Sequence, residues 1–225
     1  MKKILFVIAM EKEATDIAKK LKLEEVKNSL KIYRKNNISL LITGIGKQQT
    51  AINLTQYLEN NKENFPDEII NVGYVGSTNT KIGTWVNVNK IYNYEWNIPG
   101  EQRYSIEGFK DFEDSKTDGN LQESKSIIKV LENCKNDSKV KILPCYSAEC
   151  FVTSTDLKKD CVFDMELHSI YLVCQMYNIK ELISLKKVSD NLSLKDYYSN
   201  INMKEVMELE SCLDILKILD FLKVI

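Results

Sequence analysis

The sequence is poor in the residues that mark several common classes of protein. Histidine occurs once, proline three times, and arginine only as Arg34 and Arg103 in 225 residues. Basic and acidic side chains nearly cancel, 31 against 32, which leaves a formal net charge of -1. Without a basic excess, the chain has no electrostatic case for binding nucleic acid or an anionic membrane surface. A small neutral ligand is the more natural partner.

The sequence also lacks long hydrophobic runs and paired cysteines. No stretch approaches the roughly 18 apolar residues that a membrane-spanning helix needs. The apolar run from Ile4 to Met10 resembles part of a signal peptide, but the charged residues 11–13 end it without a small-residue cleavage site. The six cysteines show no close pair of metal-ligand spacing. We therefore expect a cytoplasmic protein with reduced cysteines, no metal and no membrane contact.

What remains is typical of a folded globular protein. Hydrophobic residues make up 44% and charged residues 28% of the chain. We expect residues 1–225 to form a single domain, although the length alone also allows two smaller ones. Short β-branched runs alternate with stretches of helical period, which predicts an α/β fold with a central, mixed, mostly parallel twisted sheet flanked by helices.

The expected elements follow from these patterns. Strands are predicted at 4–9, 31–33, 38–42, 68–72, 85–91, 140–145 and 182–188. Helices are predicted at 13–21, 48–60, 124–133, 165–177 and 203–224. Residues 98–119 show no clear period and are interpreted as a long, functionally variable loop.

Glycines stand at the ends of two predicted strands. Gly44-Ile45-Gly46 is half of a dinucleotide fingerprint, but Gln49 occupies the next position of the pattern and no acidic residue follows at the required interval. We therefore expect no nucleotide cofactor. Glycines at strand ends let the backbone approach a ligand closely. The alternative is that Gly44 and Gly73 only permit tight turns.

Acidic residues also gather at the ends of apolar runs. Glu13 follows the first run, Asp164 and Glu166 follow another, and Asp190 ends a third. Carboxylates at the ends of buried elements are costly unless they are used or satisfied, which is why we interpret the chain as an enzyme. Taken singly, Glu13 could lie on a solvated helix face and Asp190 could cap a helix or form a turn.

Five motifs together carry a family resemblance. They are 9–13 (Ala-Met-Glu-Lys-Glu), 43–47 (Thr-Gly-Ile-Gly-Lys), 70–76 (Ile-Asn-Val-Gly-Tyr-Val-Gly), 163–166 (Phe-Asp-Met-Glu) and 188–190 (Val-Ser-Asp). Their order and spacing resemble those of the purine nucleoside phosphorylase superfamily, and most of all its methylthioadenosine/S-adenosylhomocysteine nucleosidases. The resemblance runs from Ile4 to Asp190 and implies the nucleoside phosphorylase-like fold, with a nucleoside as the small-molecule partner.

The resemblance implies a role for each motif. Asp190 would protonate the purine ring, Glu13 would activate water, and Glu166 would bind the ribose hydroxyls above Met165. These roles suit an oxocarbenium-like transition state, and Asp190 would need a raised pKa to act as an acid. Phe151 would stack on the base, although core packing is the ordinary role of such a residue. The other substrate-binding residues implied are Met10, Ile45, Tyr74, Val75, Gly76, Val152, Asp164, Lys186 and Ser189.

Some positions depart from the family pattern. Tyr74 and Ser77 stand where a small residue and a glycine are usual, and a phenol there would reshape the pocket floor. Leu167 and His168 follow Glu166 where small residues are typical, and His168 is more easily interpreted as an ordinary helix residue than a catalytic one. Lys186 stands where the family often has arginine, so its role in binding hydroxyls or at an interface is open.

The resemblance leaves the reaction and substrate to be decided. A phosphorylase holds phosphate best with arginine, and neither Arg34 nor Arg103 lies in a motif, so hydrolysis is favoured over phosphorolysis. The implied substrate is a 5′-modified adenosine such as methylthioadenosine or S-adenosylhomocysteine, with other purine nucleosides open. The family also implies a homodimer. A catalytically weak nucleoside-binding protein and a purely structural domain remain alternatives.

Overall fold

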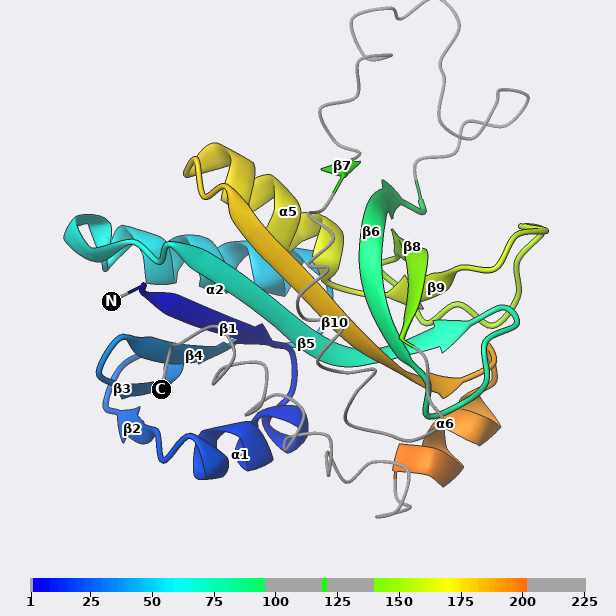
Figure 1. The fold of residues 1–225 in the computed structure, drawn as a ribbon, viewed down its shortest axis with the longest axis horizontal. Helices are drawn as coiled ribbons and strands as arrows, with labels where there is room; N and C mark the ends of the chain where they lie inside the picture. Colours follow the sequence, from blue (N-terminus) through cyan, green and yellow to red (C-terminus); the bar gives the residue numbers. More distant parts are fainter. Residues whose placement is uncertain (1, 96–118, 121–139, 202–225) are drawn as a thin grey trace, which may run out of the picture.

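The computed structural model describes residues 2–95, 119–120 and 140–201. The helices predicted at 124–133 and 203–224, and the loop predicted at 98–119 apart from its last residue, therefore lie outside the described residues. The described part forms one mixed sheet with helices on both faces (Figure 1). None of the helices described is long and apolar enough to cross a membrane.

One half of the sheet is open. Its centre is β1 (Ile4–Ile8), which pairs in parallel with β4 (Ile38–Ile42) on one side and with β5 (Glu68–Ser77) on the other. Strand β3 (Lys31–Lys35) continues the sheet antiparallel to β4, and β2 (Glu24–Val26) forms its edge. All five residues of β1 are buried, as expected of a strand covered on both faces.

The other half closes on itself. Strand β5 also pairs with β10 (Glu181–Asp190), β10 pairs with β6 (Trp85–Asn93), and β6 pairs with β8 (Lys141–Ser147). Strand β9 (Val162–Asp164) then bridges β8 back to β5, so that five strands make a small barrel. The short β7 (Gly119–Asn120) adds to β6. Strand β5 thus belongs to both halves.

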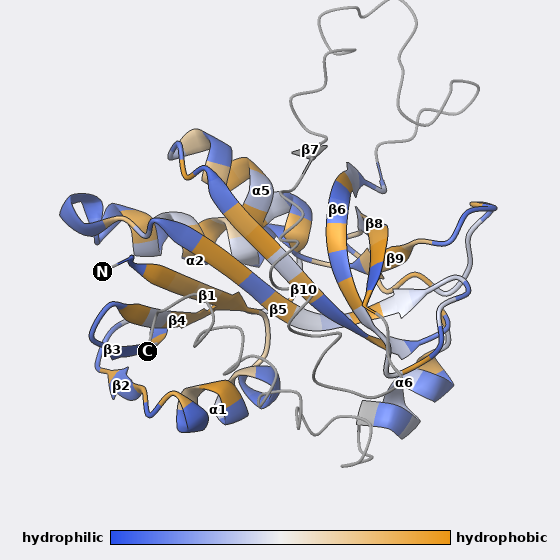
Figure 2. Cartoon of the chain, in the orientation of Figure 1, coloured by the Kyte–Doolittle hydropathy of each residue, from blue (hydrophilic) through white to orange (hydrophobic). Residues whose placement is uncertain are grey.

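Helices cover both faces of the open half. Helix α1 (Glu11–Lys20) lies on one face, and α2 (Lys47–Glu59) and α5 (Leu167–Met176) lie side by side on the other (Figure 1). The alternation along β1 explains this arrangement, because Phe6 packs in a cluster with Ile17 of α1 while Val7 packs in a cluster with Leu54 of α2. Figure 2 shows the apolar residues concentrated in the central strands. The remaining helices are η1 (Lys62–Asn64) and α6 (Leu194–Ile201).

The expected mixed α/β fold is confirmed, with differences in detail. Among the described strands, antiparallel pairings are as numerous as parallel ones, because β2, β3, β7 and β9 bring antiparallel neighbours and β6 runs antiparallel to β10. Strand β5 continues to residue 77 rather than 72, since its glycines stay extended and paired with β10. Helix α5 begins at residue 167 rather than 165, which leaves Met165 and Glu166 in the turn before it. Strands β2, β7 and β9 and helix α6 were not predicted.

Candidate active site

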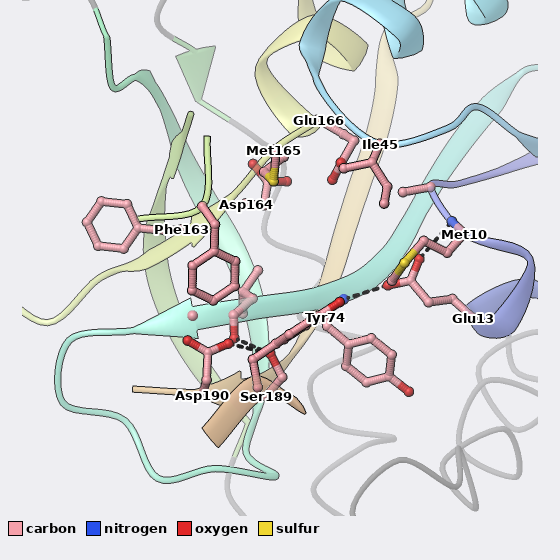
Figure 3. A pocket seen from close by; sticks show the side chains of 15 residues that line it. Met10, Glu13, Ile45, Tyr74, Phe163, Asp164, Met165, Glu166, Ser189 and Asp190 are labelled. Carbon is pink, nitrogen blue, oxygen red and sulfur yellow. Dashed lines mark hydrogen bonds between the residues drawn. The ribbon is translucent and has the colours of Figure 1, made fainter. Parts of the chain in front are cut away.

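A pocket opens at the carboxyl ends of β1, β4, β5 and β10. These strands are parallel and in register, so their carboxyl ends meet at one edge of the sheet. The pocket holds about 480 Å³ of empty space, its open mouth included. Figure 3 shows Glu13, Glu166 and Asp190 on three sides of this hollow.

Glu13 enters the pocket from the first turn of α1. It reaches back so that its Oε2 accepts the backbone N–H of Met10 at 3.0 Å, the acidic half of a capping box. Its Oε1 accepts the backbone N–H of Tyr74 at 3.1 Å. Burial raises the pKa of Glu13 to about 6, although nearby Lys186 and the two N–H groups favour its charged form.

The position of Glu13 depends on a gap beside β5. The last residue of β5 paired with β1 is Asn71, and the first paired with β9 is Gly76. Between them, within the described part of the chain, this edge of β5 has no strand partner, and the N–H of Tyr74 is given to Glu13 instead. A Cβ on Gly73 would lie 3.2 Å from the Glu13 carboxylate, so a glycine permits this close approach.

Glu166 lies in the turn before α5, on the opposite side of the pocket. Its side chain is 8% exposed, and its Oε1 accepts the backbone N–H of Gly46 at 3.0 Å. Gly46 has φ of 96°, a conformation that side chains rarely adopt, and this turns its N–H toward the carboxylate. Burial, then the charge of Asp164, raises the pKa of Glu166 to about 7.

A buried ion pair lies beneath these two acids. The Lys186 ammonium is 2.8 Å from Asp164, and both side chains are almost completely buried. Burial would raise the pKa of Asp164, but Lys186 and hydrogen bonds from Ser147 and from the N–H of Leu167 together lower it. Burial opposes the charge of Lys186 too, yet its acidic neighbours raise its pKa. The pair is therefore ionised and supplies fixed charge next to Glu13 and Glu166.

Asp190 ends β10 at the third side of the pocket. It is 1% exposed, and its carboxylate accepts the Ser189 hydroxyl at 2.8 Å and the N–H of Leu192 at 3.0 Å. Burial raises the pKa of Asp190, and the hydrogen bonds oppose that effect. The direction is the one the sequence predicted. A Cβ on Gly76 would lie 2.9 Å from this carboxylate, so here too only a glycine of β5 leaves room for the acid.

Aromatic and apolar side chains complete the walls. Phe163 of β9 is 5% exposed and Phe151 is partly buried, and both line the pocket with Met165. Tyr197 of α6 meets Phe151 edge to face, with ring centroids 5.4 Å apart. Burial, followed by the charges of Glu13 and Asp190, raises the pKa of Tyr197 to about 12. The pocket thus joins flat apolar walls to three carboxyl groups.

The structure brings most of the predicted site residues into this one pocket. Those that line it are Met10, Glu13, Ile45, Tyr74, Val75, Gly76, Phe151, Asp164, Met165, Glu166, Ser189 and Asp190. Val152 lines a smaller adjoining hollow, and Lys186 lies beneath the pocket without lining it. His168 is buried, its backbone N–H donates to Ser147, and it is not among the residues that line the pocket.

Three lining residues were not predicted: Ala9, Phe163 and Tyr197. Phe163 stands within a motif used for the resemblance, and a short buried strand of alternating side chains could have indicated its direction. Tyr197 could have been found from the helical spacing of Leu194, Tyr197, Tyr198 and Ile201 after Ser193.

Comparison with solved structures gives the same fold. The chain is similar to a methylthioadenosine/S-adenosylhomocysteine nucleosidase from Colwellia psychrerythraea in complex with adenine, with TM-score 0.79, 16% identity, and 98% of this chain and 96% of that chain covered. It is similar to a 5′-methylthioadenosine nucleosidase from Arabidopsis thaliana, with TM-score 0.77, 18% identity and coverages of 98% and 96%. It is also similar to a futalosine hydrolase mutant from Helicobacter pylori, with TM-score 0.75, 18% identity and coverages of 98% and 99%.

Sequence comparison places the chain in a family. No curated protein matches the sequence. The model of the phosphorylase superfamily matches residues 3–210, nearly the whole chain. That match agrees with the fold shared with the solved structures. The chain belongs to the phosphorylase superfamily, which comprises nucleoside phosphorylases and nucleosidases.

Proposed function

We propose that the protein hydrolyses the N-ribosidic bond of a purine nucleoside. The observation that carries this proposal is the meeting of Glu13, Glu166 and Asp190, from three separate parts of the chain, around one pocket. Burial raises the pKa of each carboxyl group, but their hydrogen-bond partners differ. Groups of one chemical type in different environments can divide acid and base roles between them.

In the proposed reaction, Asp190 is the general acid. The bond between the anomeric carbon and the ring nitrogen breaks, and its electron pair leaves with the base. Asp190 donates a proton to the purine, so that the base departs without a negative charge. The raised pKa of Asp190 favours its protonated form, which is the form that this role requires.

Glu13 is proposed as the general base. A water molecule forms the new bond to the anomeric carbon, and Glu13 takes its proton, which balances the one that Asp190 gave up. A pKa of about 6 keeps Glu13 mostly ionised at neutral pH while leaving it basic enough to accept a proton. Its two backbone hydrogen bonds fix the carboxylate in place for this step.

The remaining walls suit the sugar and the base. Glu166 is proposed to bind the ribose hydroxyls, with Met165 packed against the sugar. Phe151 supplies a flat ring for the purine, and Phe163 extends the apolar wall on the same side. The ionised pair of Asp164 and Lys186 lies beneath them and keeps two fixed charges close to Glu13 and Glu166.

The occupied N–H groups favour water over phosphate as the nucleophile. Backbone N–H groups at the α2 N-terminus could hold an anion, but Gly46 donates to Glu166 and Lys47 donates to Glu149. Lys186 is already paired with Asp164. Arg34 lies on β3, away from the pocket, and Arg103 lies outside the described residues. Phosphate would therefore meet carboxylates here rather than free donors.

The proposed substrate is a 5′-modified adenosine such as methylthioadenosine or S-adenosylhomocysteine. The nucleosidases from Colwellia psychrerythraea and Arabidopsis thaliana share the fold over nearly their whole length. Futalosine is the second candidate, because a futalosine hydrolase shares the fold to a similar extent. Tyr74 and Tyr197 add two phenol side chains to this pocket and are proposed to influence the choice among these nucleosides.

We also propose that the chain acts as a single-domain homodimer in the cytoplasm. Three large apolar side chains are exposed on the packed pair of helices α2 and α5: Ile52 is 61%, Leu172 36% and Met176 63% exposed. Ile45, 55% exposed, extends this apolar surface to the pocket mouth. A second copy covering the surface would narrow the mouth. The cysteines of the described part are free thiols.

The direct test is to incubate the purified protein with methylthioadenosine, S-adenosylhomocysteine, futalosine, adenosine and inosine, with and without inorganic phosphate. We expect free base and free sugar product from a 5′-modified nucleoside at the same rate in both conditions. Asp190→Asn should lower turnover by about 10²–10⁴-fold while still binding the nucleoside.

Three results would contradict the proposal. Strict dependence on phosphate with accumulation of ribose 1-phosphate would make the protein a phosphorylase. Binding of a nucleoside without release of base would make it a binding protein. Full activity in Asp190→Asn would remove the assigned acid.

A further inference from the structure

A second cavity lies at the opposite end of the same parallel strands. It holds about 960 Å³ of empty space, its open mouth included, which is more than the pocket described above. Its walls include Lys3 just before β1, Arg34 of β3, the turn residues Asn36 and Asn37, and Asn64 of η1. The set is basic and rich in amides, and no acidic side chain is among the described residues that line it.

Arg34 is held rigidly by neutral partners. Its Nε donates to the Ser39 hydroxyl at 3.1 Å, and its Nη2 donates to the Tyr57 hydroxyl at 3.4 Å and to the Asn61 side chain at 3.1 Å. A guanidinium has five N–H groups, and these contacts use three of them. The two N–H groups of Nη1 have no acceptor among the described residues, and the positive charge has no counter-ion there.

Lys3 adds a second uncompensated cation to the cavity. Its ammonium forms no ion pair within the described part of the chain, whereas the neighbouring Lys2 is paired with Glu68 and Glu181. Two acids are adjacent in sequence to the cavity wall, Glu63 and Asp67, and neither lines the cavity; Asp67 accepts the backbone N–H of Lys3. Two partly buried cations therefore face one cavity without an acidic partner.

The arrangement of donors selects among anions. A planar carboxylate pairs best with two nitrogens along one edge of a guanidinium. A guanidinium has two such edges, Nε with Nη2 and Nη1 with Nη2. Neither is available in Arg34, because both N–H groups of Nη2 already donate to Tyr57 and Asn61. Nη1 of Arg34, the Lys3 ammonium and the amides of Asn36 and Asn64 instead offer single-point donors in the cavity wall, while the Asn37 amide already donates to the Lys2 carbonyl. We propose that this cavity binds a phosphate group, free or as a phosphate monoester, at a site separate from the catalytic pocket.

The test is calorimetric titration of the intact protein with inorganic phosphate, glycerol 2-phosphate and acetate at constant ionic strength. Phosphate or the monoester should bind, and acetate should bind at least about tenfold more weakly. Tighter binding of glycerol 2-phosphate than of inorganic phosphate would identify a monoester as the ligand, and the reverse order would identify free phosphate. Arg34→Gln and Lys3→Gln should each weaken binding by about tenfold.

Matched variants separate this site from general charge effects and from the catalytic pocket. Lys35→Gln removes a charge from the neighbouring residue of β3, which does not line the cavity, and should leave phosphate affinity unchanged. Asp190→Asn should also leave it unchanged. Lys3→Gln keeps the inference testable if Arg34→Gln fails to fold. Equal affinity in wild type and Lys3→Gln, equal binding of acetate, or loss of binding only in Asp190→Asn would overturn the proposal.

Discussion

The two cavities at opposite ends of the central parallel strands carry opposite chemistry. At the carboxyl ends, Glu13, Glu166 and Asp190 are buried to 3%, 8% and 1% exposure and are satisfied by backbone N–H or hydroxyl groups. At the amino ends, Arg34 and Lys3 are partly exposed and have no acidic partner in the described part of the chain. Burial raises the carboxyl pKa values more than the hydrogen-bond donors lower them, and so creates acid–base groups, whereas partial exposure leaves cations suited to binding alone.

The strongest way to break this comparison is to neutralise an acid at the carboxyl ends. Glu13→Gln should reduce kcat by about 10²–10⁴-fold, because the amide cannot accept a proton from water. Steady-state release of free base measures the effect. The matched control is Glu11→Gln, an exposed acid in the same turn of α1, which should retain wild-type turnover. Equal losses in both variants would show that the turn, not the carboxylate of Glu13, is required.

The next largest effect concerns the stability of the buried pair. Lys186→Met leaves Asp164 charged and buried without its partner, and should lower the free energy of unfolding by about 3–5 kcal/mol. Urea denaturation measures this loss. Lys141→Met, which breaks the more exposed pair with Asp160, should cost no more than about 1 kcal/mol. Similar losses of unfolding free energy in the two variants would show that burial does not make the Asp164–Lys186 pair more important for stability than the exposed pair.

The pH dependence of stability sharpens the comparison further. The pKa of Glu166 is about 7 in the folded protein and 4.5 without the fold. In that interval the unfolded chain binds fewer protons, so stability falls as pH rises from 4.5 to about 7. The contribution is on the order of 2–3 kcal/mol. Glu166→Gln should remove the Glu166 share of that fall and leave the smaller share of Glu13, whose pKa is raised to about 6, and urea midpoints across this pH range will show it. If wild type and Glu166→Gln show parallel curves of stability against pH, the role assigned to Glu166 is wrong. The control is Glu63→Gln on the exposed η1, which should leave the wild-type pH dependence unchanged.

The smallest expected effect is on the aromatic wall. Phe151→Leu keeps the apolar volume but removes the flat ring, which should weaken nucleoside binding by about 0.5–1.5 kcal/mol, a few-fold to tenfold rise in KM. Phe65→Leu is the control, because Phe65 packs against Tyr177 instead of lining the pocket. An unchanged KM in Phe151→Leu would place the base elsewhere.

Local sequence patterns predicted most strands and helices of the open half. The runs at 4–9 and 38–42 are short, apolar and bounded by charged or turn residues, and they form β1 and β4 almost as expected. The closure of the other half was not predictable in this way. It depends on β9, which has only three residues, and on β5 continuing through glycines that weigh against a strand. Pairing between distant segments decides both.

Only part of the site could be predicted from the sequence. Motif order indicated that Glu13, Glu166 and Asp190 belong together, and the structure brings them to one pocket. The sequence did not reveal that Tyr74 contributes its backbone N–H to Glu13, because that depends on the gap between β1 and β9 beside β5. The sequence also did not predict that Lys186 lies beneath the pocket and pairs with Asp164, because that ion pair is a tertiary contact between distant segments.

Strand β5 also bears on how the protein would lose the proposed activity. It is bonded to β10 along nearly its whole length and, on either side of the gap at Tyr74, to β1 and β9 on its other edge, so most of its amide hydrogens exchange only when the sheet opens. The same strand carries the glycines against which Glu13 and Asp190 rest. Catalytic competence should therefore survive fraying of the outer hairpin and vanish in step with cooperative unfolding, so residual turnover can report the folded fraction directly.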